Sequence, residues 1–243
     1  MPNPFFRFKQ FTVYHDRCAM KVTTDACLFG AWTAEAIHNG QLAIGKNRML
    51  DIGTGTGLLS LMVAQKNSGI IDAVEIEKAA EEQAKDNVNA SPWKESIKVI
   101  NADITEWKPE ALYDVIFANP PFYERELKSE STAKNIAHHE GGLSLAVLFK
   151  FIKMNLEKEG NFFLLLPAKR KEEIATLLER HHLHVEKWVL VQQTLQHHPF
   201  RLMVQGRLQK TKEITESLLA VKDNEDAYTK EFTSLLQPYY LYL

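Results

Sequence analysis

The sequence predicts an α/β protein with one seven-stranded, mostly parallel sheet and helices on both of its faces. Short apolar runs rich in β-branched residues alternate with helical patterns, as in consecutive βαβ units. The runs in the first part of the chain are nearly all apolar, which is typical of strands covered on both faces. The expected strands are Met49–Ile52, Ile70–Glu75, Ile97–Asn101, Tyr113–Ala118, Asn161–Leu166, Val185–Gln192 and Leu202–Leu208.

Helical patterns fill the gaps between these strands. Lys78–Asn89 places Ala80 and Ala84 four residues apart, so that they share one face of a helix. Pro92 disfavours helix at the residue before it and so ends this pattern. The polar segment Lys212–Asp226 carries no expected strand. The other expected helices are Gly57–Lys66, Leu143–Leu156, Arg170–His181 and Tyr228–Leu236.

The composition is that of an ordinary globular protein and excludes several classes. Of 243 residues, 45% are apolar and 25% are charged, and 29 basic residues nearly balance 31 acidic ones. No run of about 18 apolar residues could span a membrane, and the N-terminus lacks the apolar core of a signal peptide. With only Cys18 and Cys27, no disulfide framework is expected, so we expect a reduced, cytoplasmic protein.

The chain shows no internal repeat and no linker that would separate two domains. We therefore expect residues 1–32 to form an N-terminal extension, with a hairpin and the start of a helix. Residues 33–243 are expected to form a single main domain, whose length suffices for a well-buried core. The sequence leaves the oligomeric state open, with a monomer as the simpler expectation.

A glycine-rich loop follows the first expected strand, in the run Asp51-Ile52-Gly53-Thr54-Gly55-Thr56-Gly57. Glycines let the backbone turn tightly and approach a ligand closely, and the helix that follows presents unpaired N–H groups. The dinucleotide fingerprint Gly-x-Gly-x-x-Gly does not fit, because Leu58 and Ser60 stand where its last glycine belongs. The simpler alternative is a glycine turn that only joins strand to helix.

This Asp-x-Gly-x-Gly-x-Gly pattern resembles the first motif of Rossmann-like S-adenosylmethionine (SAM) methyltransferases. The resemblance implies that Asp51 helps to hold the cationic methionine end of SAM, through its amino group. It also implies that the backbone of Gly53, Thr54, Gly55 and Gly57 packs against the cofactor.

Acidic residues also end the next two expected strands. Glu75 suits hydrogen bonds to both ribose hydroxyls, and the resemblance puts Asp103 beside the adenine amino group of SAM. Their neighbours Ile76 and Ile104 join the expected cofactor-binding set, as does Asn119 after the fourth expected strand. Either carboxylate alone could be an ordinary solvated strand end. Three acidic residues at successive carboxyl ends of strands instead indicate a ligand in that crevice.

Asn119-Pro120-Pro121-Phe122 follows the fourth expected strand. This run resembles the Asn-Pro-Pro-aromatic motif of methyltransferases that modify a planar nitrogen. The side-chain carbonyl of Asn119 and the backbone carbonyl of Pro120 could accept the two N–H bonds of an exocyclic amine, which frees its lone pair for attack on the methyl group. The two prolines restrict the backbone, and Pro121 and Phe122 are expected to contact the substrate, with Phe122 stacked on the flat base. The alternative is a proline-terminated strand with Phe122 in the core.

The N-terminal extension narrows the resemblance. The segments Phe8-Lys9-Gln10-Phe11, His15–Val22, Thr24-Asp25 and Gly30-Ala31-Trp32 look like the start of bacterial tRNA(Val) adenine-N6-methyltransferases, as do Asn89–Trp93 and the aromatic C-terminus. The resemblance implies transfer of a methyl group from SAM to N6 of adenine 37 in the tRNA. It also implies that the extension lies against the cofactor site, with Lys21 to Asp25 closing it. A plain hairpin followed by a helix cap is the alternative.

The net charge of −2 hides segments of opposite sign. Residues 1–21 hold four basic residues and one acid, and residues 150–171 hold six and two, whereas 72–82 and 213–231 are acidic. Arg7 and Lys9 interleave with phenylalanines, as in a surface that stacks bases and contacts phosphates, so both are expected to bind RNA. Alternatively, the phenylalanines are the core of a hairpin and the lysines its solvated face.

Neither a metal nor a membrane is expected. The histidine pairs at 138–139, 181–182 and 197–198 point apart within each pair, and no carboxylate or cysteine stands at ligand spacing. Two other functions stay open. The same motif could methylate guanine N2 of ribosomal RNA or a glutamine amide of a protein, or the chain could bind SAM and dock RNA without catalysis.

Overall fold

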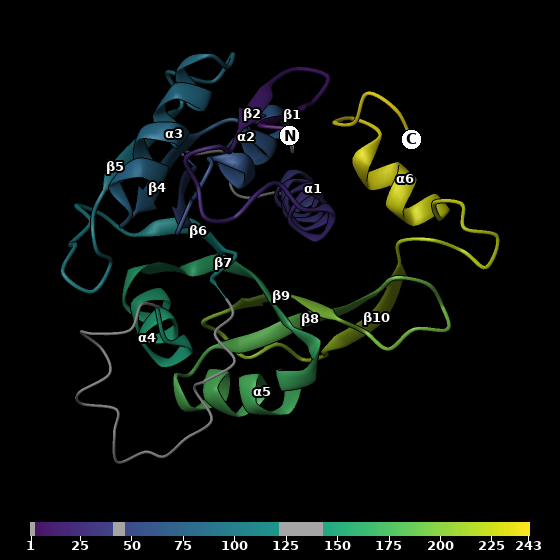
Figure 1. Ribbon diagram of the computed structural model, residues 1–243. Coiled ribbons are helices and arrows are strands. Elements are labelled where there is room, and N and C mark those ends of the chain that lie inside the picture. Colours follow the sequence, from purple (N-terminus) through teal and green to yellow (C-terminus); the bar gives the residue numbers. More distant parts are fainter. Residues whose placement is uncertain (1–2, 41–46, 122–142) are drawn as a thin grey trace.

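The computed structural model describes residues 3–40, 47–121 and 143–243 and confirms an α/β fold around a mostly parallel sheet. The sheet has eight strands in the order β10-β8-β9-β7-β6-β3-β4-β5, and only β9 runs antiparallel to its neighbours (Figure 1). Its strands are β3 (Arg48–Ile52), β4 (Ile70–Glu75), β5 (Ile97–Asn101), β6 (Tyr113–Ala118), β7 (Leu156–Pro167), β8 (His184–Gln192), β9 (Arg201–Arg207) and β10 (Thr215–Ala220).

The expected count of seven strands was wrong because β10 was missed. This strand forms one edge of the sheet and pairs only with β8. Its first four residues are exposed, and only Leu219 and Ala220 are buried. An edge strand tolerates such polar residues, so its sequence lacks the apolar run that marks the inner strands.

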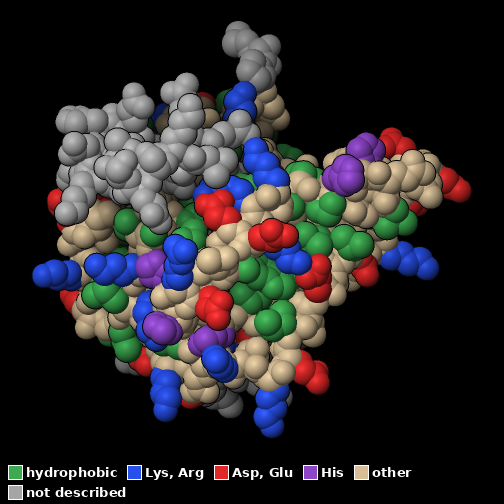
Figure 2. All heavy atoms as spheres, turned by 90° about the horizontal axis from the view of Figure 1, so that it is seen from below, with side chains coloured by type: hydrophobic (Ala, Val, Ile, Leu, Met, Phe, Trp, Pro, Cys, Tyr) green, Lys and Arg blue, Asp and Glu red, His purple; other side chains and the backbone are tan. Residues whose placement is uncertain are grey.

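Helices cover both faces of the sheet. One face carries α1 (Thr24–Asn39), α2 (Leu58–Lys66), α3 (Lys78–Asn89) and α6 (Lys230–Leu236), and the other carries α4 (Leu145–Asn155) and α5 (Lys171–Arg180) (Figure 1). On the face of α4 and α5, basic and acidic side chains are interspersed with a hydrophobic patch (Figure 2). In the described part of the chain, no helix has the length and apolar character needed to cross a membrane.

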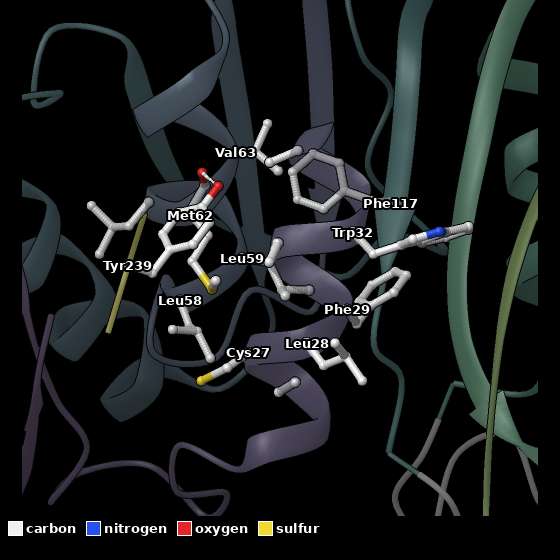
Figure 3. Packing of buried hydrophobic residues seen from close by; sticks show 14 of the residues in the cluster. Cys27, Leu28, Phe29, Trp32, Leu58, Leu59, Met62, Val63, Phe117 and Tyr239 are labelled. Carbon is white, nitrogen blue, oxygen red and sulfur yellow. Dashed lines mark hydrogen bonds between the residues drawn. The ribbon is translucent and has the colours of Figure 1, made fainter. Parts of the chain in front are cut away.

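Two hydrophobic clusters form the core because neighbouring side chains of a strand point to opposite faces. Along β6, Val115 and Phe117 belong to the cluster under α1 and α2, whereas Ile116 and Ala118 belong to the cluster under α4 and α5. Figure 3 shows the first cluster, where side chains of α1 and α2 meet Phe117 of the sheet and Tyr239 of the C-terminal segment. Buried strands with apolar residues on both faces therefore need both helical layers.

The N-terminal hairpin, β1 (Phe5–Arg7) and β2 (Thr12–Tyr14), belongs to this first cluster. Phe8 is 2% exposed and stacks on Phe11, with their ring centroids 4.5 Å apart. Phe8 also forms a β-bridge with Tyr240 of the C-terminal segment. These two phenylalanines are core residues, as the alternative above had it. The expected domain boundary after residue 32 lies inside α1 and stays a prediction.

Replacing Phe8 by alanine tests this structural role. Phe8→Ala should lower the free energy of unfolding by about 3–5 kcal/mol, the usual effect of removing a buried aromatic ring. Denaturant titration measures the change, with Tyr242→Ala as the control, because Tyr242 is 90% exposed and its loss should cost less than about 0.5 kcal/mol. Unchanged stability together with weaker RNA binding would instead mean that Phe8 acts by stacking on bases.

Candidate active site

Three neighbouring strands bring expected site residues to the same height along the carboxyl edge of the sheet. Strand β3 lies between β4 and β6, and Ile52 pairs with Val74 on one side and with Ala118 on the other. Each paired residue is followed directly by a site residue: Gly53 comes just after β3, Asn119 comes just after β6, and Glu75 is the last residue of β4. Because neighbouring strands lie about 4.8 Å apart, this register brings the glycine loop, the expected ribose carboxylate and the expected catalytic amide side by side.

The glycine loop, which joins β3 to α2, turns sharply at the end of β3 and is bonded to β4. Gly53, Gly55 and Gly57 have φ values of 70°, 54° and 80°, a conformation that favours glycine over other residues. A Cβ atom at Gly53 or Gly55 would meet no heavy atom within 4 Å, so the loop borders open space where a ligand could approach the backbone. The N–H groups of Gly53 and Thr54 both donate to the Val74 carbonyl and so fix the turn to β4.

Asp51 lies beneath this loop and is fully buried. Its Oδ2 accepts hydrogen bonds from the hydroxyls of Thr54 and Ser60, both at 2.7 Å. Its Oδ1 has no hydrogen-bond partner within the described residues. Burial raises the pKa of Asp51 to about 6, although the two hydroxyl bonds oppose this shift. A buried carboxylate oxygen without a donor fits the chemistry of a cationic amino group, and the expected contact of Asp51 with SAM stays a prediction.

Glu75 is almost fully buried beside the loop. Its two oxygens accept backbone N–H bonds from Gly55 at 2.8 Å and from Glu77 at 3.0 Å. Each carboxylate oxygen can accept a further bond, so both could still serve ribose hydroxyls. The next residue, Ile76, is 60% exposed, which is unusual for isoleucine and fits an apolar surface for a ligand.

Asp103 and Ile104 differ in how they could serve the cofactor. Asp103 is half-buried, and its Oδ1 accepts the N–H of Thr105 at 2.8 Å, so its carboxylate also caps a turn. The side chain of Ile104 is buried in the cluster under α4 and α5. A contact between Ile104 and the cofactor would therefore have to come from its backbone.

The residues of the Asn-Pro-Pro run continue from β6 at the same edge. Asn119 is half-buried, Pro120 is buried and Pro121 is exposed. Phe122 lies outside the described residues. Strand order therefore places Asn119 next to the glycine loop, on the side opposite Glu75.

Arg7 and Lys9 are exposed on the hairpin, as expected, but the structure does not bring them to this edge. The Lys9 ammonium donates to the Gln237 carbonyl at 2.5 Å, and the Lys9 N–H donates to the Tyr239 carbonyl. The Tyr239 hydroxyl donates to the Met62 carbonyl in the middle of α2, and the Gln65 amide, near the end of α2 that is away from the glycine loop, donates to the Pro238 carbonyl. The expected role of Arg7 and Lys9 in binding RNA stays a prediction.

The basic residues of segment 150–171 do not form a single positively charged surface either. Lys158 lies near the start of the twelve-residue strand β7, and Lys169 follows its end, so they lie at opposite edges of the sheet. Arg170 pairs with Glu173, and Lys171 pairs with Glu216.

Two residues that the sequence did not single out support the site. Ser60 supplies one of the two hydroxyls on Asp51, and the Asn101 amide donates to the carbonyls of Glu75 and Ile76. Ser60 lies one helical turn into α2 and reads in sequence as part of the helix. Among the described residues, no group of three or more histidine, cysteine or acidic side chains could hold a metal ion.

Comparisons with known proteins agree with this geometry. Residues 37–189 match the family model described as methyltransferase small domain. A protein of Phocaeicola vulgatus, named tRNA1(Val) (adenine(37)-N6)-methyltransferase, is 39% identical over 241 residues, which cover 99% of each chain. Proteins with the same name from Dyadobacter fermentans and Pseudoalteromonas translucida are 47% and 38% identical, over 71% and 97% of this chain and 69% and 98% of their own.

Solved structures support the fold at much lower identity. A predicted O-methyltransferase from Agrobacterium tumefaciens has a TM-score of 0.61 at 16% identity and covers 88% of this chain and 96% of its own. A glycopeptide N-methyltransferase solved with SAM has a TM-score of 0.54 at 10% identity, over 74% and 94% of the two chains. The chain thus belongs to the methyltransferase small domain family of SAM-dependent methyltransferases, among bacterial relatives that are named tRNA1(Val) (adenine(37)-N6)-methyltransferase.

Proposed function

We propose that this protein transfers a methyl group from SAM to the exocyclic N6 of adenine 37 in tRNA1(Val), in the cytoplasm. The observation that carries the proposal is the shared level of Gly53 and Asn119 at the edge of the sheet, above the buried Asp51. A methyl donor held by Asp51 and Glu75 and an amine held at Asn119 would then be neighbours. Bound SAM supplies an electrophilic methyl group, and the protein holds the acceptor nitrogen.

The role of Asn119 and Pro120 is to accept hydrogen bonds. The side-chain carbonyl of Asn119 and the backbone carbonyl of Pro120 would each take one N–H of the adenine amine, which favours a pyramidal nitrogen with its lone pair available. Catalysis then rests on positioning and polarisation. The adenine has to leave its stack to reach this position, as in other enzymes that modify a base.

The choice of tRNA adenine over other planar nitrogens rests on the relatives. Several proteins with this name align with nearly the whole chain at 35–39% identity. A guanine amine, a glutamine amide and binding of SAM without catalysis are the alternatives. An Asn-Pro-Pro run at the site supports catalysis over simple binding, since a binding module needs no pair of acceptors for an amine.

The acceptor is identified by incubating the protein with methyl-labelled SAM and separate pools of tRNA, ribosomal RNA and protein. We expect label in tRNA alone, recovered as N6-methyladenosine. A tRNA1(Val) transcript with adenine 37 replaced by guanine is the matched control and should take up no label. Label in ribosomal RNA or protein would reject the proposed substrate, and no label in any pool would favour the binding module.

Replacing Asn119 by alanine separates catalysis from cofactor binding. Asn119→Ala should reduce methyl transfer to tRNA at least about 100-fold, the usual loss when one polarising group is removed. The affinity for SAM, measured by calorimetry, should stay within about threefold of the unmodified protein, because the cofactor carboxylates are untouched. Full activity in this variant would reject the assigned role of Asn119.

Replacing Asp51 by asparagine removes the charge that is expected to hold the cofactor. Asp51→Asn should weaken SAM binding at least tenfold, or about 1.4 kcal/mol. The unmodified protein should also lose affinity as the pH falls below about 6, because Asp51 becomes protonated there and no longer attracts the amino group. The variant should lack this pH dependence in calorimetry between pH 5 and 8. Equal affinities and equal pH profiles would contradict the assignment of Asp51.

A further inference from the structure

The segment between β2 and α1 runs from the hairpin to the edge of the sheet that carries the site. At its start, Arg17 pairs with Asp86 of α3 and donates to Gln83 of the same helix. The next residue, Cys18, is half-buried, and burial together with the charge of Glu75 raises the pKa of its thiol to about 11. The segment therefore runs along α3, the helix that follows β4 and Glu75.

Its other end is also fixed at this edge. The hydroxyl of Thr23 caps α1, and Asp25 in the first turn pairs with Arg201 at the start of β9, with 2.7 Å between Nε and Oδ2. Strand β9 begins opposite the end of β7, so this ion pair lies at the carboxyl edge of the sheet. The chain from Tyr14 to Asp25 is thus held at both ends around the cofactor side of the sheet.

One buried side chain joins this segment to the glycine loop. Asn87 of α3 is 1% exposed, and its Oδ1 accepts the N–H of Tyr14 at 3.0 Å. Its Nδ2 donates to the Tyr14 carbonyl at 2.8 Å and to the Thr56 carbonyl at 2.9 Å. Both hydrogens of the amide and its oxygen are used, so this one group binds two separate backbone segments.

We propose that Asn87 is a positioning residue for the SAM site. It holds the Tyr14–Cys18 segment against the glycine loop, so that this segment forms a wall of the cofactor site beside Glu75. Thr56 lies between Gly55 and Gly57 in this loop, and both glycines have positive φ. Without the Asn87 amide, the Thr56 carbonyl loses a buried donor. The N–H and the carbonyl of Tyr14 also lose the bonds that they make with Asn87. The proposal rests on SAM binding at this edge and not on which nucleotide is methylated.

The test compares Asn87→Asp with Asn89→Ala. Aspartate keeps the size of the side chain and the acceptor for Tyr14, but it has no donor for the carbonyls of Tyr14 and Thr56. Asn89 ends the same helix and is exposed, so its replacement is the matched control. Three properties are measured: the SAM affinity, KM for SAM against kcat, and amide hydrogen exchange over residues 14–22 and 53–57 with and without SAM.

We expect Asn87→Asp to weaken SAM binding about tenfold or more and to raise KM for SAM, with kcat at saturating SAM within about threefold of the unmodified protein. SAM should slow hydrogen exchange of both segments in the unmodified protein, and this protection of residues 14–22 should be lost in the variant. Asn89→Ala should behave as the unmodified protein does.

A second variant keeps the proposal testable if Asn87→Asp fails to fold. Arg17→Ala removes the exposed ion pair with Asp86 and the guanidinium bond to Gln83, and it should weaken SAM binding several-fold and speed exchange of residues 14–22. SAM affinity within twofold of the unmodified protein in every folded variant would overturn the proposal. So would a uniform rise in exchange over the whole chain with kcat and KM unchanged, which indicates a purely structural role. If the unmodified protein binds SAM but methylates no tRNA, the proposed function fails and this inference stands.

Discussion

The register of three parallel strands is the constraint on which the site depends. Ile52 pairs at one level with Val74 and Ala118, so the residues that follow in β3, β4 and β6 leave the sheet together. A slip of one residue in either pairing would turn the affected side chains to the opposite face of the sheet. The two hydrophobic clusters oppose such a slip, because alternate residues of β6 are buried in different clusters. The packing of the core thus fixes the distance between the cofactor residues and Asn119.

Burial strengthens the attraction of Asp51 for a cationic ligand, and it also raises the free energy of the charged carboxylate. A carboxylate without water favours its neutral form, and the hydroxyls of Thr54 and Ser60 only partly offset that effect. Without a ligand, the unpartnered Oδ1 raises the free energy of the charged carboxylate, because no donor replaces the water it has lost. A cationic ligand would supply that donor. Asn87 is another buried polar group at this site, and its amide joins the glycine loop to the N-terminal segment.

Much of the fold could be predicted from the sequence because the inner strands are continuous apolar runs that end in distinctive residues. Asp51, Glu75 and Asn119 were recognisable by their positions after strands, and the structure places them together. Strand β10 was not predictable, since an exposed edge strand has no apolar pattern. The same limit applies to Asn87. Its partners, Tyr14 and Thr56, are 73 and 31 residues away in sequence, and nothing local marks an asparagine in a helix as a link between them.

The phenylalanines of the hairpin illustrate a different limit. Aromatic residues between basic ones have the same pattern on a nucleic-acid surface and in a hairpin whose inner face is buried. The contact of Phe8 with Phe11 and Tyr240 decides for the core, and it depends on the C-terminal segment more than 200 residues away. The count of charges along a segment has the same weakness, because Lys158 and Lys169 of the basic segment 150–171 lie at opposite edges of the sheet.

The most direct measurement is a crystal structure of the protein with SAM bound. The account predicts the amino nitrogen of SAM within hydrogen-bonding distance of Asp51 Oδ1, about 2.7–3.2 Å. It also predicts that the ribose hydroxyls lie on Glu75 and that the methyl group faces Asn119. A cofactor bound elsewhere, or one at this edge with its methyl group turned away from Asn119, would contradict the account.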